Sequence, residues 1–392
     1  MRQKVFAGVL VLVMCALAVG PAVSQGRSLK VGFVTTLSGG GAALGVDVLD
    51  GFQLALRHLG GRLGGLPVEV VTVDDQLNPD VARTAVERLL RRDRVDLLTG
   101  IIFSNVLLAV GDLIFSHGTF YISPNAGPSE YAGEQCNLHF LNVAWQNDNL
   151  HEAMGHYAQL KGYETAFILA PNYPAGRDAL NGFKRFYKGR VVAEVYTRLG
   201  QLDYSAEIAQ IRAARPRAVY AFYPGAMGVN FIKQYAEAGL MQQVQLLVPG
   251  FSADQDVIRA VGKPMVGVYN SSHWALELFN PINRRFVEDF RRTYGRIPTL
   301  YAAQGYDAAL AMDHGLRAVG QDLSRKADFR KAILSGFDST RGRVRFSKNG
   351  YPIQDYYLRQ VVETPQGEII NRLRGVIFRA HKDAYVSRCN LP

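Results

Sequence analysis

Residues 97–130 hold the side chains best suited to binding a charged small molecule. We expect a buried strand that ends at Gly100, a helix that begins at Ser104, and a second strand, Phe120–Ile122, that leads into the loop 123–128. A hydroxyl at a helix start and a small-residue loop at the next strand end gather backbone N–H groups around one point. The sequence therefore predicts a site for a carboxylate or a phosphate.

Residue patterns typical of catalysis or of a cofactor site are weak. His151 and His156 are five positions apart, about 140° around a helix, so they are poorly placed to share a metal, and we expect an ordinary surface helix there. The glycine run 39–41 lacks the Gly-Lys-Ser/Thr ending of a nucleotide loop, and residues 74–75 fit a strand end or a helix cap better than a metal site. Ser104 lacks the flanking glycines of a nucleophile elbow, and no histidine lies at a plausible strand end to activate it. We predict no enzyme, no metal and no cofactor; a secreted hydrolase would need a base near Ser104.

Aromatic or polar residues recur at the ends of the predicted strands. Ligands in open α/β sheets bind beyond the carboxyl ends of the strands, so such residues in two sheets that face one cleft predict a joint binding site. These residues are Phe103, Ser104, Trp145, Gln146, Tyr173, Tyr223, Phe251 and Trp274.

Strand-like and helical segments alternate along most of the chain. The runs 29–36 and 68–75 are rich in β-formers, and apolar residues recur at helical spacing in 43–59 and 79–92. Such alternation predicts right-handed βαβ units, and hence an α/β fold whose parallel sheet is covered by helices on both faces.

A second α/β block is expected after the loop-like stretch that follows residue 123. It runs from a helix at 149–162 to a strand at 265–269. The consecutive helices 283–294 and 301–319 cannot extend a parallel sheet, so we expect them to pack on the first block, while hairpins near 343–370 close the second. The chain would then cross several times between two blocks that enclose a hinged cleft.

The chain length also favours two domains. We predict an N-terminal lobe formed by residues 28–143 plus 277–338. A C-terminal lobe formed by residues 144–276 plus 339–378 would follow, with a C-terminal tail at 379–392.

The N-terminus carries the signs of export. Met1-Arg2-Gln3-Lys4 precedes an apolar run and a small-residue cleavage site, so residues 1–24 are predicted to be a cleaved signal peptide, with a single membrane anchor as the alternative. The formal net charge of +10 is spread at helix-surface spacing without an aromatic-basic motif. We therefore expect a solvated basic surface and no nucleic-acid partner.

Two cysteines, Cys136 and Cys389, would remain after cleavage. In an oxidising compartment one disulfide between them is the simplest explanation, and it would tie the C-terminal tail to the middle of the chain. Two buried free thiols are the alternative.

Several short segments, in their order and spacing, resemble the type I periplasmic solute-binding proteins of ABC importers, in the leucine/isoleucine/valine-binding branch. The resemblance runs from about Leu29 to Phe378 and implies two Rossmann-like α/β domains, joined by three hinge crossings, that close on a ligand. Its markers are Thr36-Leu-Ser-Gly, Asp74-Asp75, Gly100 with Ser104, Ile122-Ser-Pro-Asn-Ala, Asn172-Tyr-Pro-Ala-Gly and Tyr301-Ala-Ala-Gln-Gly-Tyr-Asp-Ala.

The resemblance also implies roles for individual residues. Ser104 matches the family serine that hydrogen-bonds the ligand carboxylate. The loop Asn125-Ala126-Gly127 matches the positions that offer backbone groups to it, and Tyr173 and Tyr223 match cleft residues from the second domain. Ser38, in the loop after the first strand, is assigned to the same site.

The departures from the family pattern concern the ligand's amino group. Phe251 and Gln146 stand where amino-acid binders carry partners for an ammonium, and Leu44 replaces a frequent tyrosine. Burying an ammonium without a carboxylate partner costs several kcal/mol, so an α-amino acid is disfavoured. With Phe103, Trp274 and the tyrosines as further walls, a flat aromatic carboxylate such as a benzoate or phenylpropenoate is predicted.

The resulting prediction is a monomeric periplasmic protein that delivers this acid to the ABC permease subunits of the inner membrane. A branched-chain amino acid or amide binder is one alternative. A ligand-sensing module for a membrane kinase or chemoreceptor is another.

Overall fold

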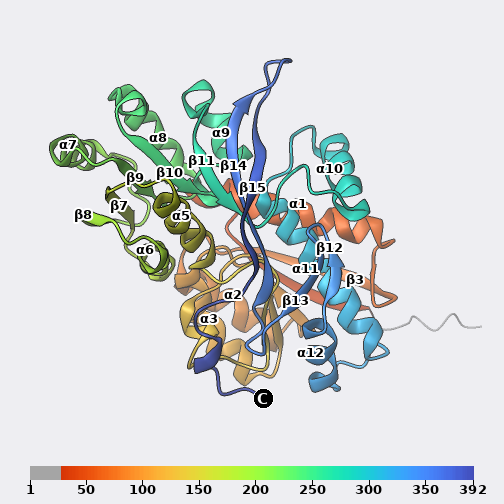
Figure 1. Cartoon of the computed structure of the whole chain (residues 1–392). Coiled ribbons are helices and arrows are strands. Elements are labelled where there is room, and N and C mark those ends of the chain that lie inside the picture. The colour runs from red at the N-terminus through yellow and green to blue at the C-terminus, as the bar shows by residue number, and fades with distance from the viewer. Residues whose placement is uncertain (1–27) are drawn as a thin grey trace, which may run out of the picture.

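The computed structural model describes residues 28–392, so the predicted signal peptide lies outside the described residues. The chain forms two α/β lobes, each built on its own sheet (Figure 1). None of the helices in this part of the chain combines the length and apolar character needed to cross a membrane.

The first sheet has six strands in the order β2-β3-β1-β4-β5-β6. Apart from the antiparallel β2–β3 hairpin, its neighbouring strands run parallel. Helices cover both faces, so the central strands are buried on both sides, and Val31 and Phe33 have no exposed surface. The strands are β1 (Leu29–Thr35), β2 (Arg62–Leu63), β3 (Leu66–Asp74), β4 (Leu97–Thr99), β5 (Phe120–Ser123) and β6 (Phe140–Asn142).

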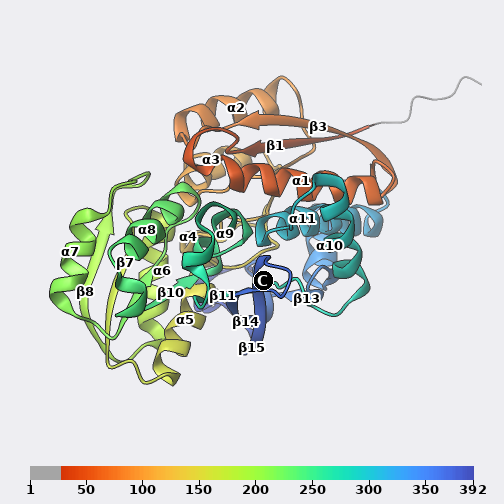
Figure 2. The same ribbon diagram turned by 90° about the horizontal axis from the view of Figure 1, so that it is seen from above.

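The helices of the first lobe come from two separate parts of the chain. The later helices pack back on the first block as expected, and α11 lies along α1 (Figure 2). The helices are α1 (Ala42–His58), α2 (Pro79–Arg91), α3 (Ser104–Ser116), α4 (Ser129–Ala132), α10 (Pro281–Tyr294), α11 (Leu300–Ala318) and α12 (Lys326–Leu334), with the 3₁₀ turn η1 at Gly39–Gly41.

The second sheet has nine strands in the order β12-β13-β14-β11-β10-β9-β7-β8, with β15 paired to β14. Strands β7 to β11 form its parallel part, and β12 to β15 are added antiparallel. The strands are β7 (Thr165–Pro171), β8 (Arg190–Thr197), β9 (Ala218–Ala221), β10 (Gln245–Pro249), β11 (Tyr269–Ser272), β12 (Phe337–Ser339), β13 (Gly342–Phe346), β14 (Pro352–Glu363) and β15 (Ile369–His381).

The helices of the second lobe are α5 (Asn149–Leu160), α6 (Pro174–Phe186), α7 (Ser205–Ala214), α8 (Ala226–Glu237) and α9 (Gln255–Val261), with 3₁₀ turns η2 (Leu240–Gln242), η3 (Gly250–Ser252), η4 (Lys263–Met265) and η5 (Val386–Arg388).

The predicted strand at 265–269 is wrong in position. A 3₁₀ turn ends at Met265 and the strand begins at Tyr269, because Gly267, at φ 98°, interrupts the extended run. The two-lobe α/β fold is confirmed, while the predicted residue limits of the lobes stay predictions.

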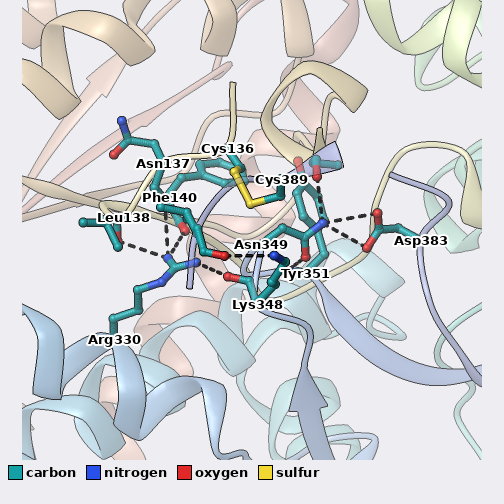
Figure 3. The surroundings of a disulfide bond; sticks show 12 residues. Cys136, Asn137, Leu138, Phe140, Arg330, Lys348, Asn349, Tyr351, Asp383 and Cys389 are labelled. Carbon is teal, nitrogen blue, oxygen red and sulfur yellow. Dashed lines mark hydrogen bonds between the residues drawn. A yellow bond between two sulfur atoms is a disulfide. The ribbon is translucent and has the colours of Figure 1, made fainter. Parts of the chain in front are cut away.

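The predicted disulfide between Cys136 and Cys389 is confirmed (Figure 3). It joins the loop before β6 to the C-terminal tail. Beside it, the buried guanidinium of Arg330 donates to the carbonyl oxygens of Phe140 and Lys348, both at 2.7 Å. Burial lowers the pKa of Arg330 to about 10, and the backbone carbonyls satisfy a cation that has no carboxylate beside it within residues 28–392.

Candidate functional site

A cleft between the two lobes gathers polar groups at the carboxyl ends of the strands. Its free space is about 20 Å³, close to the room that one water needs, so the side chains of the two lobes nearly fill it. Within residues 28–392, no Asp, Glu, Lys or Arg belongs to the lining. The lining residues are Leu44, Ile102, Phe103, Ser104, Asn125, Trp145, Asn147, His151, Tyr173, Ala175, Phe222, Pro224, Phe251 and Tyr301.

Gly100 turns the chain from β4 towards the cleft. Its φ is 108°, and a Cβ there would lie 2.5 Å from the carbonyl oxygen of Val34, so only glycine fits. The turn brings Ser104 to the first position of α3, where the leading N–H groups of the helix have no acceptor inside it. These groups and the positive end of the helix dipole favour an anion.

The Ser104 hydroxyl is oriented by Asn147. Nδ2 of Asn147 donates to Oγ of Ser104 at 3.1 Å, so the hydrogen of the hydroxyl remains for an acceptor in the cleft. The same Nδ2 lies 3.0 Å from Oδ2 of Asp178, which also accepts from the backbone N–H of Ser129 at 3.1 Å. Since Ser129 belongs to α4 and Asp178 to α6, these bonds join the two lobes beside the serine.

Asp178 is buried next to this anion-binding end. Burial, reinforced by the charge of Asp148, raises its pKa to about 8. The carboxyl is therefore neutral at pH 7, and it does not repel an anion bound at Ser104.

The loop 125–127 is placed beside Ser104 but its backbone is largely occupied. The N–H of Ala126 faces the carbonyl of Ile101 at 3.4 Å, and the N–H of Gly127 donates to Oδ1 of Asn147 at 3.0 Å. Only Asn125 belongs to the cleft lining, and its Nδ2 donates to the carbonyl of Ile102 at 2.7 Å. The loop thus supports the cleft. The family resemblance implies that its backbone binds the ligand, but the N–H groups of Ala126 and Gly127 are already bonded within the protein.

Aromatic rings form the walls of the cleft. Tyr173 lies 6.3 Å from Phe103 across the lobes and 6.3 Å from Phe222, measured between ring centroids. Phe251 follows at 5.5 Å from Phe222, and its ring meets Trp145 edge-on at 4.4 Å. Such an array offers both ring faces and ring edges to a flat ligand.

His151 is a lining residue that the sequence analysis placed on a surface helix, and that expectation is wrong. The side chain is 1 % exposed, because α5 is covered by α6 and by strands of the second sheet. Nδ1 of His151 is hydrogen-bonded to the hydroxyl of Tyr220, and burial lowers the pKa of the imidazole to about 3. A neutral histidine therefore faces the cleft.

Besides Ala126 and Gly127, four predicted site residues lie outside the lining. Ser38 is exposed and hydrogen-bonds Asp74. Gln146 turns its Nε2 to Asp148 at 2.9 Å, and Trp274 donates to Asn283 at 2.7 Å. Tyr223 is buried in a separate core, where its hydroxyl accepts from Thr197 at 3.1 Å. For the last three, an adjacent residue (Trp145, His273 or Phe222) faces the cleft or its wall instead.

Five lining residues other than His151 were not predicted from the sequence: Ile102, Ala175, Phe222, Pro224 and Tyr301. Position offered a signal for two of them, since Phe222 adjoins a predicted strand end and Tyr301 begins one of the family-like segments. Within residues 28–392, no group of His, Cys, Asp or Glu could hold a metal. No histidine or acid in the described chain hydrogen-bonds Ser104, so the base required by a hydrolase has no candidate there.

Comparison with known proteins places this architecture among solute-binding proteins. A curated relative, the Leu/Ile/Val-binding protein homolog 6 of Brucella melitensis, is 27% identical over 358 residues, covering 88% of this chain and 90% of the relative.

Solved structures of solute-binding proteins also resemble this chain. An ABC-transporter solute-binding protein from R. palustris in complex with benzoate has a TM-score of 0.87 and 31% identity, over 93% of this chain and 100% of the other. Another, from Rhodopseudomonas palustris BisB5 in complex with 3,4-dihydroxybenzoic acid, has a TM-score of 0.84 and 25% identity, over 91% and 99%. The family model for periplasmic binding proteins matches residues 28–367, so the chain belongs to the periplasmic binding protein family.

Proposed function

We propose that the protein is the periplasmic solute-binding component of an ABC importer and that it holds a small aromatic carboxylate between its lobes. One observation carries the proposal: an anion-binding helix start faces aromatic walls in a cleft without an acidic lining residue, within the described chain. The carboxylate would accept hydrogen bonds from Ser104 and from the first N–H groups of α3. The ring would lie among Tyr173, Phe222 and Phe251.

The charge of the lining argues against an α-amino acid. Its ammonium group would be buried without a carboxylate, at a cost of several kcal/mol. The buried acid that Asn147 links to Ser104 is Asp178, which is neutral at pH 7 and already accepts two hydrogen bonds. A ligand with one negative end and an apolar body avoids this cost.

The relatives support both the lead proposal and one alternative. The R. palustris proteins at 31% and 25% identity were solved with benzoate and with 3,4-dihydroxybenzoic acid, which fits an aromatic-acid ligand here. The Brucella relatives are named as Leu/Ile/Val-binding homologues, which keeps a branched-chain amino acid as the second candidate. The absence of acidic lining residues in residues 28–392 favours the aromatic acid.

Transport would follow from closure of the lobes. We take the N-terminal lobe as residues 28–143 plus 277–338 and the C-terminal lobe as 144–276 plus 339–378. The hydrogen bond from the N–H of Ser129 to Asp178 joins the two lobes beside Ser104. A signal peptide at 1–24 would bring a monomer to the periplasm, where permease subunits receive the ligand.

The test is a binding panel of benzoates, cinnamates and aliphatic amino acids, measured by calorimetry and tryptophan fluorescence. The chain has two tryptophans, of which Trp145 lines the cleft and Trp274 does not. Benzoates should therefore change the fluorescence of W274F, which retains Trp145, and leave that of W145F nearly unchanged. Binding of leucine with no response to any aromatic acid would contradict the ligand assignment.

A further inference from the structure

His151 lies one helical turn beyond the residue that orients the anion-binding serine. Asn147 and His151 both line the cleft and are four positions apart, and the backbone of Asp148 between them is already helical, at φ −66° and ψ −28°. Four residues advance a helix by about 6 Å, close to the length of 4-hydroxybenzoate from its carboxyl carbon to its ring hydroxyl. The spacing of the two positions along the chain is therefore comparable to the length of one small aromatic acid.

The buried hydroxyl of Tyr220 determines which nitrogen of His151 carries the proton. Tyr220 is fully buried, and Nδ1 of His151 is the partner of its hydroxyl. If Nδ1 donated this bond, the hydroxyl hydrogen of Tyr220 would be buried without an acceptor, which is costly. Tyr220 therefore donates to Nδ1, and Nε2 carries the hydrogen of the neutral imidazole.

Nε2 of His151 is the nitrogen available to a ligand. It has no hydrogen-bond partner anywhere in residues 28–392, although the ring lines the cleft. Neighbouring rings fix its orientation, with Phe222 at 4.9 Å edge-on and Phe251 at 5.7 Å. The same cleft holds two buried polar atoms without a partner in the described chain, Oδ1 of Asn125 and the hydroxyl oxygen of Tyr301.

We propose that Nε2–H of His151 donates a hydrogen bond to a ring oxygen opposite the carboxylate, so that the cleft selects oxygen-substituted aromatic acids over unsubstituted benzoate. The inference rests on the proposed aromatic-acid function and deepens it. Tyr220 acts as a positioning residue, because it fixes the tautomer without reaching the ligand. A ligand that lacks the oxygen leaves the N–H of His151 buried without an acceptor. This cost lowers the affinity for such a ligand more than a change in apolar contact would.

The test compares the affinities of 4-hydroxybenzoate and benzoate by calorimetry. The wild-type protein should prefer 4-hydroxybenzoate by about tenfold or more, since the site would otherwise lose a buried hydrogen bond. In the variant H151F/Y220F, which removes the imidazole without leaving a lone tyrosine hydroxyl, this preference should fall below about threefold. In Y220F alone the preference should fall part of the way, because both tautomers become accessible.

A matched control is H156F, on the same helix. The ring of His156 contacts Phe186 and Phe378 away from the cleft, so this variant should keep the wild-type preference. A second measurement uses the wild-type protein alone: ¹⁵N and ¹H NMR should show His151 protonated at Nε2 and not at Nδ1. The Nε2 proton should then shift on adding 4-hydroxybenzoate much more than on adding benzoate.

The outcomes separate the two levels of the proposal. Equal wild-type affinity for both acids, an equal loss of both acids in H151F/Y220F, or protonation at Nδ1 would overturn the role of His151 and leave the aromatic-acid function standing. Binding of leucine without either acid would instead overturn the proposed function, and the inference with it.

Discussion

Ser104 and Asn147 act as a pair at the anion-binding end of the cleft. We expect Ser104→Ala to weaken benzoate binding by about 1–3 kcal/mol, because the carboxylate loses a charged hydrogen bond and Nδ2 of Asn147 loses an acceptor. Calorimetry measures the change. Ser116→Ala is the matched control, since Ser116 is exposed at the other end of the same helix and should leave the affinity unchanged. An unaltered affinity in Ser104→Ala would place the carboxylate elsewhere.

The raised pKa of Asp178 has a consequence for stability. Its pKa is about 8 in the folded protein and about 4 in an unfolded chain, so between these values the folded state holds a proton that the unfolded state lacks. The contribution of Asp178 to the free energy of unfolding must therefore decrease as pH rises through this window.

Asp178→Asn keeps an acceptor for Ser129 and Asn147 but cannot ionise. Relative to this variant, we expect the wild-type protein to lose about 1–3 kcal/mol of stability between pH 5 and pH 7, measured by urea unfolding at each pH. Parallel profiles for the two proteins would show that Asp178 ionises normally in the fold.

At the scale of single residues, the sequence predicted where the cleft lies better than it predicted which side chains line it. Ser104, Phe103, Tyr173 and Phe251 were predicted and line it. At strand ends, successive side chains point to opposite sides, so Tyr223 was predicted where Phe222 faces the cleft, and of the predicted neighbours Trp145 and Gln146 only Trp145 faces it. A residue type at a strand end predicts the site, but the side to which it points depends on the last strand residue, which sequence patterns locate only to within a residue or two.

At the scale of elements, α5 shows why a polar pattern can mislead. Glu152 and His156 suggest a solvent-exposed helix, yet Glu152 is 1 % exposed and pairs with Arg185 and His381. His381 belongs to β15, whose full length, Ile369–His381, was not predicted. The helix is buried because a distant strand covers it, which is information that no local periodicity contains.

The link between β4 and α3 gives a prediction at this same scale. Gly100→Ala should destabilise the protein by more than the usual cost of about 1–3 kcal/mol for a strained backbone, because the added Cβ would meet the carbonyl of Val34 at 2.5 Å. It should also weaken ligand binding, since the start of α3 must shift. Gly267→Ala is the control: its φ of 98° is similar, but a Cβ there meets nothing within 4 Å. Thermal and urea unfolding compare the two, and equal losses would show that only φ matters at Gly100.

For the whole molecule, the alternation of strands and helices predicted two α/β lobes. The presence of two cysteines after the signal peptide predicted that they form one disulfide. Neither pattern indicated how the tail runs after the last strand. The hydroxyl of Tyr385 donates to Asp148 of the second lobe at 2.8 Å, and Cys389 is bonded to Cys136 in the first. The tail thus contacts both lobes, through packing that only the folded chain brings together.

The disulfide closes a loop of 253 residues, so it removes many conformations from the unfolded chain. We expect the double variant C136S/C389S to lower the free energy of unfolding by about 2–4 kcal/mol, and a reductant to produce a similar loss in the wild-type protein but none in the variant. Neither cysteine lines the cleft, so benzoate affinity should stay within about threefold of wild type. Urea unfolding and calorimetry on the same samples separate the two effects. A loss of affinity at unchanged stability would mean that the tail controls the closed arrangement of the lobes rather than the stability of the fold.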